Sequence, residues 1–417
     1  MLRKVLAATA VVMTPTWAVA SVQRPTPSTL LEFTPAPYQI RVLLSEATGT
    51  HEVRGYDLRW NLPLKADRST RWDVRCTPWA VTVREAGTAT WRQTRGAVTV
   101  SSPAGFVFLD GHPVREELRV GPGPHGCRVS NRLDLEKYLE GLVNAEFSSK
   151  WSPEAVASQI VAARSYALYE ILAAKRSGRD FDVRSTILDQ VYGGARAEDA
   201  AAARAVRRTR GWVLVERHHP RQPIKAFYHS SCGGTTELPE RVWGGPYAGY
   251  GRHRVSCPYC AGAPKAHWQF ALSELQLIEA VRRGSISDGR EPGWPADWYR
   301  RAASYRLERI WTEAWKGSPR VREVHFSWAH PGGLAQGRMD LALPATRLRH
   351  WLGQDRLLST LFQVARGRDG RWGFEGRGNG HGVGLCQYGA KRMGELGMNH
   401  RKILAHYYPD ATLAKMW

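Results

Sequence analysis

One carboxylate stands out because of its place along the chain. Glu146 lies where one helix-like pattern ends and another is about to begin, and apolar Phe147 and Trp151 follow it closely. The negative end of a helix dipole and an apolar environment both disfavour a charged carboxylate, so both raise its pKa. A carboxyl that stays protonated near neutral pH can serve as a general acid. The alternative, which spacing alone favours, is an exposed glutamate at a helix end.

The cysteines and one histidine form a second set of chemically capable residues. The chain has six cysteines: Cys76, Cys127, Cys232, Cys257, Cys260 and Cys386. His229 precedes Cys232 by three positions, and Cys257 and Cys260 repeat that spacing. Pairs spaced in this way suit tetrahedral zinc, so we predict a structural zinc site, with disulfides as the competing interpretation in an oxidising compartment. The first two cysteines are candidates for a separate disulfide.

The glycine-rich stretch GRGNGHGVG at 376–384 does not fit a phosphate-binding loop. It has neither the G-x-G-x-x-G register nor a following Gly-Lys-Ser/Thr. Its glycines allow a tight backbone path that places His381 and Gln387 at a surface, and a purely structural turn is the alternative. The chain also lacks the H-E-x-x-H, G-x-S-x-G and EF-hand signatures of other enzymes and calcium sites.

Two predicted helices position Glu146. Asp134 is the expected cap of the first helix, whose apolar residues recur at three- and four-residue spacing. Ser152 is the expected cap of the second, with Pro153 at its first position and an end near 176–180. Short β-branched runs separated by Gly and Pro precede them from residue 40, which indicates a β-rich segment.

Further elements follow, and together they predict a mixed α+β fold. We expect helices at AEDAAAARAVRRTRG, ATRLRHWLG and NHRKILAHYYP, and strands at WVLVE, IKAFYHS, REVHFSWAH and GRMDLALP. Residues 285–321 match no interpretable motif. The expected domain covers 40–414, with a β-rich part at 40–125 and a catalytic α/β part at 126–414.

The first residues and the charge indicate an exported protein. A basic start, a short apolar run and Ala-Val-Ala at 18–20 predict a cleavable signal sequence at 1–20, and a Pro-, Ser- and Thr-rich linker follows at 21–39. No stretch is apolar for long enough to span a bilayer, so we expect no transmembrane anchor. The chain of 417 residues carries a net charge of +21. Outside the cytoplasm, anionic wall polymers and lipid head groups are the partners that such a charge favours, and without an RNA-binding motif we expect no nucleic acid.

Several separated motifs resemble the SpoIID/LytB family of bacterial cell-wall proteins. They are LEKYLEGLVNAEFSSKWSPEAVASQIVAARSYAL, DQVYGG, AFYHSSCGGTTELPERVWGG, CPYC and GRGNGHGVGLCQYGAKRMGELGMNHRKILAHYYPDATL, in the order found in the family. The resemblance spans roughly residues 40–414 and implies a SpoIID-like fold with helices around a glycan-binding groove. It also implies that Glu146 is the catalytic general acid. Family members often carry Met-Pro after this glutamate, where this chain has Phe147 and Ser148.

The family includes lytic transglycosylases that cut glycan strands stripped of their stem peptides, and enhancers of cell-wall amidases. The resemblance therefore implies cleavage between N-acetylmuramic acid and N-acetylglucosamine with one catalytic carboxylate and no cofactor required for the chemistry. Its alternative is a glycan-binding protein that recruits or stimulates an amidase. A zinc hydrolase is disfavoured, because a cysteine-rich site is closed and structural. The residues expected to line the groove are Gln159, Arg164, Tyr166, Asp189, Gln190, Tyr192, His381 and Gln387; for Arg164 and Tyr166, helix packing and ion pairing is the alternative.

Overall fold

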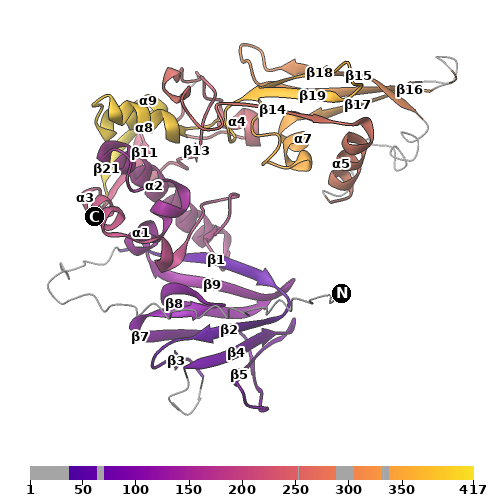
Figure 1. The fold of residues 1–417 in the computed structure, drawn as a ribbon. Coiled ribbons are helices and arrows are strands. Elements are labelled where there is room, and N and C mark those ends of the chain that lie inside the picture. Colours follow the sequence, from indigo (N-terminus) through magenta and orange to yellow (C-terminus); the bar gives the residue numbers. More distant parts are fainter. Residues whose placement is uncertain (1–36, 63–69, 252, 288–304, 331, 333–337) are drawn as a thin grey trace, which may run out of the picture. The chain divides into compact units, whose positions relative to one another are not determined.

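The computed structural model describes residues 37–62, 70–251, 253–287, 305–330, 332 and 338–417 (Figure 1). Strands and helices both recur along this part of the chain, so the predicted mixed α+β class is confirmed. The expected signal sequence and most of the expected linker lie outside the described residues. Within the described residues, no helix combines the length and apolar character needed to cross a membrane.

The N-terminal part forms one sheet. Its strands are β1 (Gln39–Ala47), β2 (Thr50–Arg54), β3 (Arg59–Trp60), β4 (Arg71–Cys76), β5 (Ala80–Glu85), β6 (Arg92–Arg95), β7 (Val98–Leu109), β8 (His112–Gly123), β9 (Gly126–Asp134) and β10 (Val183–Arg184). They are ordered β10-β1-β9-β8-β7-β2-β4-β5-β6, with β3 paired to β7, and only β10 pairs in parallel. Because β9 continues the sheet, the β-rich part extends beyond the expected boundary at residue 125.

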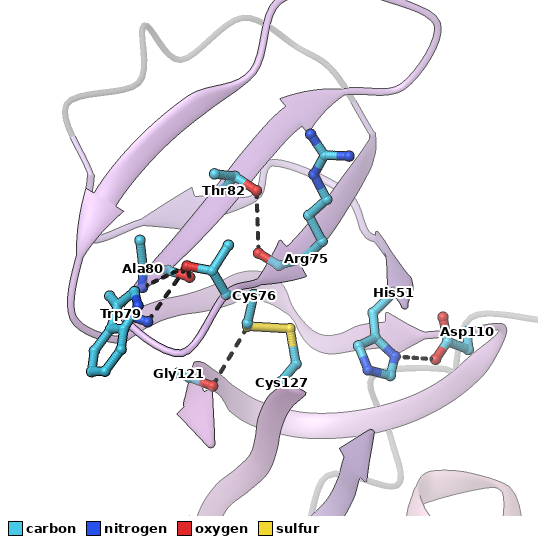
Figure 2. Close-up of a disulfide and its surroundings, with 10 residues drawn as sticks. His51, Arg75, Cys76, Trp79, Ala80, Thr82, Asp110, Gly121 and Cys127 are labelled. Carbon is cyan, nitrogen blue, oxygen red and sulfur yellow. Dashed lines mark hydrogen bonds and ion pairs between the residues drawn. A yellow bond between two sulfur atoms is a disulfide. The ribbon is translucent and has the colours of Figure 1, made fainter. Parts of the chain in front are cut away.

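A disulfide joins two strands that are not neighbours in this order. It links Cys76 on β4 to Cys127 on β9, as expected from the sequence (Figure 2). Since β9 and β4 are separated by β8, β7 and β2, the sheet must curl for these cysteines to meet. Inward-facing apolar residues such as Val74, Val100 and Leu118 fill the space that the curl encloses.

The two helices around Glu146 follow their sequence signals closely. Helix α1 (Leu135–Glu146) begins after Asp134, whose carboxylate accepts a hydrogen bond from the backbone N–H of Glu136 at 2.7 Å. Helix α2 (Pro153–Ser177) is capped by Ser152 and ends at Gly178, which adopts the left-handed conformation with φ 69°. Helix α2 is buried along most of its length and packs against α8 (Gln387–Glu395) and α9 (His400–Tyr407).

Smaller elements complete this region. They are η2 (Gly194–Ala197), α3 (Ala200–Arg208), β11 (Trp212–Glu216), β12 (His219–Pro223), β13 (Tyr228–His229), α4 (Pro239–Trp243), η3 (Pro258–Cys260), β20 (Leu385–Cys386) and β21 (Ala411–Lys415). The strand expected at IKAFYHS is shorter than predicted, because only β13 forms there. It pairs in parallel with β20, which brings two segments about 150 residues apart in sequence side by side.

A second β-rich region occupies residues 267–377 and has its own apolar core. Its elements are β14 (His267–Leu272), α5 (Glu274–Ser287), β15 (Arg306–Ala314), β16 (Val321–Ala329), β17 (Arg338–Pro344), α7 (Ala345–Leu352), β18 (Phe362–Arg366) and β19 (Trp372–Arg377). They make two three-stranded sheets, β14-β19-β18 and β15-β16-β17. The predicted strands and helix at 322–353 are confirmed, and β15 lies in the segment that matched no motif.

Candidate functional site

A cavity of about 1220 Å³ lies beside Glu146. Its lining comes from the end of α1 and the loop after it, from α2, from the segments at 187–191, 225–230 and 242–247, from α7 and the loops beside it, and from 379–388. Sequence-distant segments therefore converge on one carboxylate. None of the lining residues comes from strands β1–β9.

Glu146 is the last residue of α1 and is half-buried at the cavity wall. Desolvation by burial raises the pKa of its carboxyl to about 7, and hydrogen bonds from the Val191 N–H and the Tyr228 hydroxyl partly oppose this rise. The Val191 N–H donates to Oε1 at 2.5 Å. Phe147 and Trp151 also line the cavity, as the apolar neighbours proposed from sequence. At neutral pH a substantial fraction of Glu146 therefore carries a proton.

A buried chain of hydrogen bonds fixes the hydroxyl that contacts Glu146. The Tyr138 hydroxyl donates to Oε1 of Gln190 at 3.0 Å, and Nε2 of Gln190 donates to the Tyr228 hydroxyl at 3.0 Å. Tyr228 can then donate its own proton to the carboxylate, and burial raises its pKa well above the ordinary value, so that proton stays on the oxygen. Gln190 does not line the cavity itself, but its hydrogen bond orients the Tyr228 hydroxyl toward Glu146.

Asp189 is a second carboxylate of the cavity, and its oxygens are engaged. The Tyr166 hydroxyl donates to Oδ1 at 2.9 Å, and the backbone N–H of Arg184 donates to Oδ2 at 2.9 Å. Tyr166 and Asp189 both line the cavity. A third carboxylate, Asp355, lies exposed at the cavity margin. Asp189 is thus held by two donors, whereas Asp355 faces solvent.

Two histidines with lowered pKa values face the same cavity. His381 accepts a hydrogen bond at Nδ1 from the Val383 N–H, so its protonated Nε2 donates to the Tyr228 carbonyl at 2.9 Å. Burial lowers the pKa of His381 well below its ordinary value and that of His229 to about 3. Both imidazoles are neutral at physiological pH. Nε2 of His229 has no hydrogen-bond partner among the described residues, which leaves an acceptor for a bound hydroxyl.

An aromatic cluster that the sequence did not single out lies beside His381, whose ring centroid is 4.9 Å from that of Trp243. The ring of Phe227 stacks on Trp243 with centroids 4.1 Å apart, and Tyr247 meets Phe227 edge-on at 5.4 Å. Trp243 remains 44% exposed. Both Trp243 and Tyr228 belong to the family-like stretch AFYHSSCGGTTELPERVWGG, which was the signal available for finding them.

The other predicted groove residues lie in different places. Gln387 lines the cavity, whereas Gln159, Arg164, Gln190 and Tyr192 are buried away from its lining. Arg164 forms a buried ion pair with Glu136 at 2.7 Å and donates to the Thr209 carbonyl, so the packing and ion-pairing alternative describes it. The Tyr192 hydroxyl donates to Asn131 at 3.1 Å. Arg164 and Tyr192 thus join separate elements, whereas both amide atoms of buried Gln159 lack a hydrogen-bond partner among the described residues.

Three of the four predicted metal ligands come together, and the fourth does not join them. Cys232, Cys257 and Cys260 cluster with Cys386, and His229 is replaced in the group. The Nδ1–H of His229 instead donates to the Val383 carbonyl at 3.0 Å. Cys386 lies 126 positions after Cys260, so local ligand spacing gave no sign of its place.

Comparisons with known proteins agree with the motifs. Residues 124–215 match the family described as Stage II sporulation protein, SpoIID. An uncharacterized protein of Brachyspira hyodysenteriae is 29% identical over 67% of this chain and 66% of its own length. The amidase enhancer of Bacillus subtilis is 27% identical over 66% of this chain and 40% of its own length. Stage II sporulation protein D of Bacillus amyloliquefaciens is 25% identical over 69% of this chain and 77% of its own length. The resemblance to the SpoIID/LytB family is confirmed, and the chain aligns with less than two thirds of the first two relatives.

Proposed function

Because this chain carries a SpoIID domain that includes Glu146, we propose that it is a lytic transglycosylase of the bacterial cell wall. Its substrate is peptide-free glycan, cut between N-acetylmuramic acid and N-acetylglucosamine. The observation that carries the proposal is a carboxyl with a pKa of about 7 at the wall of a large cavity. Such a group is protonated often enough at neutral pH to donate a proton to a leaving oxygen.

The reaction needs one group that gives a proton and then takes one. Glu146 protonates the bridging oxygen, and the bond to C1 of N-acetylmuramic acid breaks. The carboxylate then removes the proton of the C6 hydroxyl of the same sugar, whose oxygen bonds to C1 and closes a 1,6-anhydro ring. The Val191 N–H and the Tyr228 hydroxyl stabilise the transient carboxylate. Both reacting groups belong to one sugar, so proximity favours ring closure over attack by water.

The rest of the cavity suits an uncharged sugar polymer. Trp243 offers an exposed aromatic face for a sugar ring, and neutral His229 offers an acceptor for a hydroxyl. The volume of about 1220 Å³ exceeds that of an ordinary small-molecule site, which is about 300–1,000 Å³. This size supports binding of several sugar units of a strand.

The test is digestion of peptide-free glycan strands by the mature protein, with products analysed by mass spectrometry. We expect fragments that end in 1,6-anhydro-N-acetylmuramic acid, and a loss of about 10²–10⁴-fold in rate for Glu146→Gln. Glu395→Gln, an exposed surface change on α8, is the matched control and should cleave normally. Reducing ends in place of anhydro ends would overturn the proposal and indicate hydrolysis, with Asp189→Asn and Asp355→Asn then testing for a second carboxylate.

A second candidate function comes from the relative named amidase enhancer. In this alternative the cavity holds peptide-free glycan without cutting it, and the protein stimulates a cell-wall amidase. Binding of glycan by both the wild type and Glu146→Gln, with no cleavage by either and faster amide hydrolysis by an added amidase, would favour this function. Retained cleavage by the wild type would exclude it as the only role.

We also propose export to the periplasm or the cell-wall space. The Cys76–Cys127 disulfide supports this location, because disulfides persist in oxidising compartments. The charge of +21 supports contact with anionic wall polymers. Fractionation of the source cell, with the N-terminal residue of the mature protein determined by mass spectrometry, tests both export and cleavage near residue 20.

A further inference from the structure

We propose that four buried cysteines bind one zinc ion that supports the cavity from behind. The four-cysteine cluster consists of Cys232, Cys257, Cys260 and Cys386. The zinc site does not rest on the proposed function, because its ligands and their geometry are independent of any glycan. Only its effect on catalysis does.

The distances in the cluster suit an ion between the sulfurs. All four Sγ atoms lie within 4.8 Å of one another, and those of Cys232 and Cys260 are 3.6 Å apart. A tetrahedral zinc ion with zinc–sulfur bonds of about 2.3 Å places its sulfurs roughly 3.8 Å apart. Two disulfides would instead bring the sulfurs together in pairs at about 2.05 Å. A single ion therefore accounts for four mutually close sulfurs better than two separate bonds do.

The site is closed, which makes it structural. The four cysteines are between 0% and 2% exposed, so no position is open to water or substrate. The polar surroundings suit thiolates. The backbone N–H of Cys232 points to Sγ of Cys386 at 3.4 Å, and the Tyr407 hydroxyl lies 3.1 Å from Sγ of Cys257. Such outer hydrogen bonds orient metal ligands and stabilise their negative charge.

A buried arginine fits the charge of an occupied site. Arg320 is 1% exposed, and its guanidinium donates to the Cys232 carbonyl at 2.6 Å. Its hydrogen bonds among the described residues go to neutral oxygens of Cys232, Thr235 and Thr360, and Glu237 acts on it only from beyond ion-pair distance. A buried unpaired charge is costly. Four thiolates around Zn²⁺ carry a net charge of −2, so the occupied site would give Arg320 a counter-charge close to its guanidinium.

The backbone of α8 approaches the cluster so closely that only glycine fits. A Cβ atom on Gly389 would lie 2.7 Å from Sγ of Cys257 and 3.2 Å from Sγ of Cys386. The four ligands themselves come from three separate segments, at 232, at 257–260 and at 386. One ion would thus fasten the N-terminus of α8 and the end of β20 to the segment that follows β13.

The cluster is continuous with the cavity wall. Cys386 is followed directly by Gln387 and Tyr388, which line the cavity, and it pairs with His229 in the β13–β20 register. Tyr228, which hydrogen-bonds to Glu146, is the preceding residue of β13. The ion would therefore hold the strand pair that positions Tyr228.

The test is to measure the metal content of the purified mature protein. The protein is produced without a histidine tag and dialysed against metal-free buffer. We expect about one zinc per chain by inductively coupled plasma mass spectrometry. Denaturing alkylation should show four free thiols and one disulfide. Zinc absent together with additional disulfides among the four cysteines would overturn the proposal, and so would stoichiometric iron.

Variants separate the ligand sets. Cys260→Ser and Cys386→Ser should lose zinc, whereas His229→Asn and the double change Cys76→Ser/Cys127→Ser should keep it. Zinc kept by Cys386→Ser but lost by His229→Asn would overturn the four-cysteine set in favour of the histidine set. If the cysteine variants do not fold, titration of the wild type with a mercurial reagent tests the ligand set, because one zinc should be released as four thiols react.

Replacing zinc with cobalt gives a spectroscopic test. The spectrum should show the absorption of a tetrahedral site with four thiolate ligands, and a spectrum that indicates a nitrogen ligand would contradict the four-cysteine set.

Discussion

The six cysteines divide between two regions that differ in how the cavity depends on them. In the N-terminal sheet, Cys76 and Cys127 close a curled sheet whose strands β1–β9 contribute nothing to the cavity lining. In the region after α1, the four-cysteine cluster shares β13, β20 and α8 with the cavity wall. A covalent bond thus supports a scaffold in the first region, and a cluster of thiols supports the site in the second.

This difference teaches where stability and activity are coupled. The sheet has a largely separate apolar core, so a weaker sheet can still leave the arrangement around Glu146 intact. The main core contains the cluster together with Tyr166 and Phe227, which line the cavity. A change there should alter stability and the site together.

The largest effect is expected from opening the four-cysteine cluster. Structural zinc contributes about 10–16 kcal/mol in small zinc domains, which is comparable to the whole stability of many proteins. Cys260→Ser should therefore lower the melting temperature strongly and abolish glycan cleavage. Thermal unfolding followed by circular dichroism, with and without zinc, measures the effect. An unchanged melting temperature would show that the cluster is not needed for stability.

The pH dependence of cleavage is the next effect in size. The pKa of Glu146 is raised from 4.5 to about 7, so its acid form is favoured in the folded protein and is lost above that pH. Cleavage should fall about tenfold for each pH unit above 7. The wild type should also lose stability relative to Glu146→Gln as the pH rises from 4.5 to about 7. A rate that stays constant from pH 7 to pH 9 would contradict the role of Glu146 as the acid.

The helices around the site could be predicted from local sequence, because a capping residue hydrogen-bonds to the backbone of residues two or three positions away. Asp134, Ser152 and Pro153 mark the two helix starts, and the apolar Phe147 signalled the raised pKa of Glu146. Contacts between distant segments had no such signal. Sequence spacing could not show that Val191 would donate to Glu146.

Where the structure places predicted site residues away from the cavity or the cysteine cluster, the reason is the same. Arg164 lies in a family-like run, yet its guanidinium binds Glu136 across two packed helices and never reaches the cavity. Cys386, and not His229, is the fourth member of the cluster with Cys232, Cys257 and Cys260. Parallel pairing of β13 and β20 brings Cys386 to this position. That pairing depends on the fold of the whole region, which no local pattern encodes.

Removing the disulfide should separate stability from activity. For a sequence separation of 51 residues, chain entropy gives a stabilisation of about 4 kcal/mol. The double change Cys76→Ser/Cys127→Ser should lower the unfolding free energy by about that amount while the rate per folded molecule stays the same. Urea unfolding and glycan digestion below the transition measure the two quantities. Loss of activity in the fully folded variant would show that the N-terminal sheet also affects the cavity, contrary to this prediction.

The smallest effect is expected from one aromatic face. Trp243 is 44% exposed beside the cavity, whereas Trp79 is 82% exposed on the N-terminal sheet. Burial of the Trp243 face by a sugar should contribute about 1.5 kcal/mol, so Trp243→Ala should weaken glycan binding roughly tenfold. Trp79→Ala is the matched control and should bind like the wild type. Equal binding by all three proteins, measured by calorimetry in the Glu146→Gln background, would place the glycan elsewhere in the cavity.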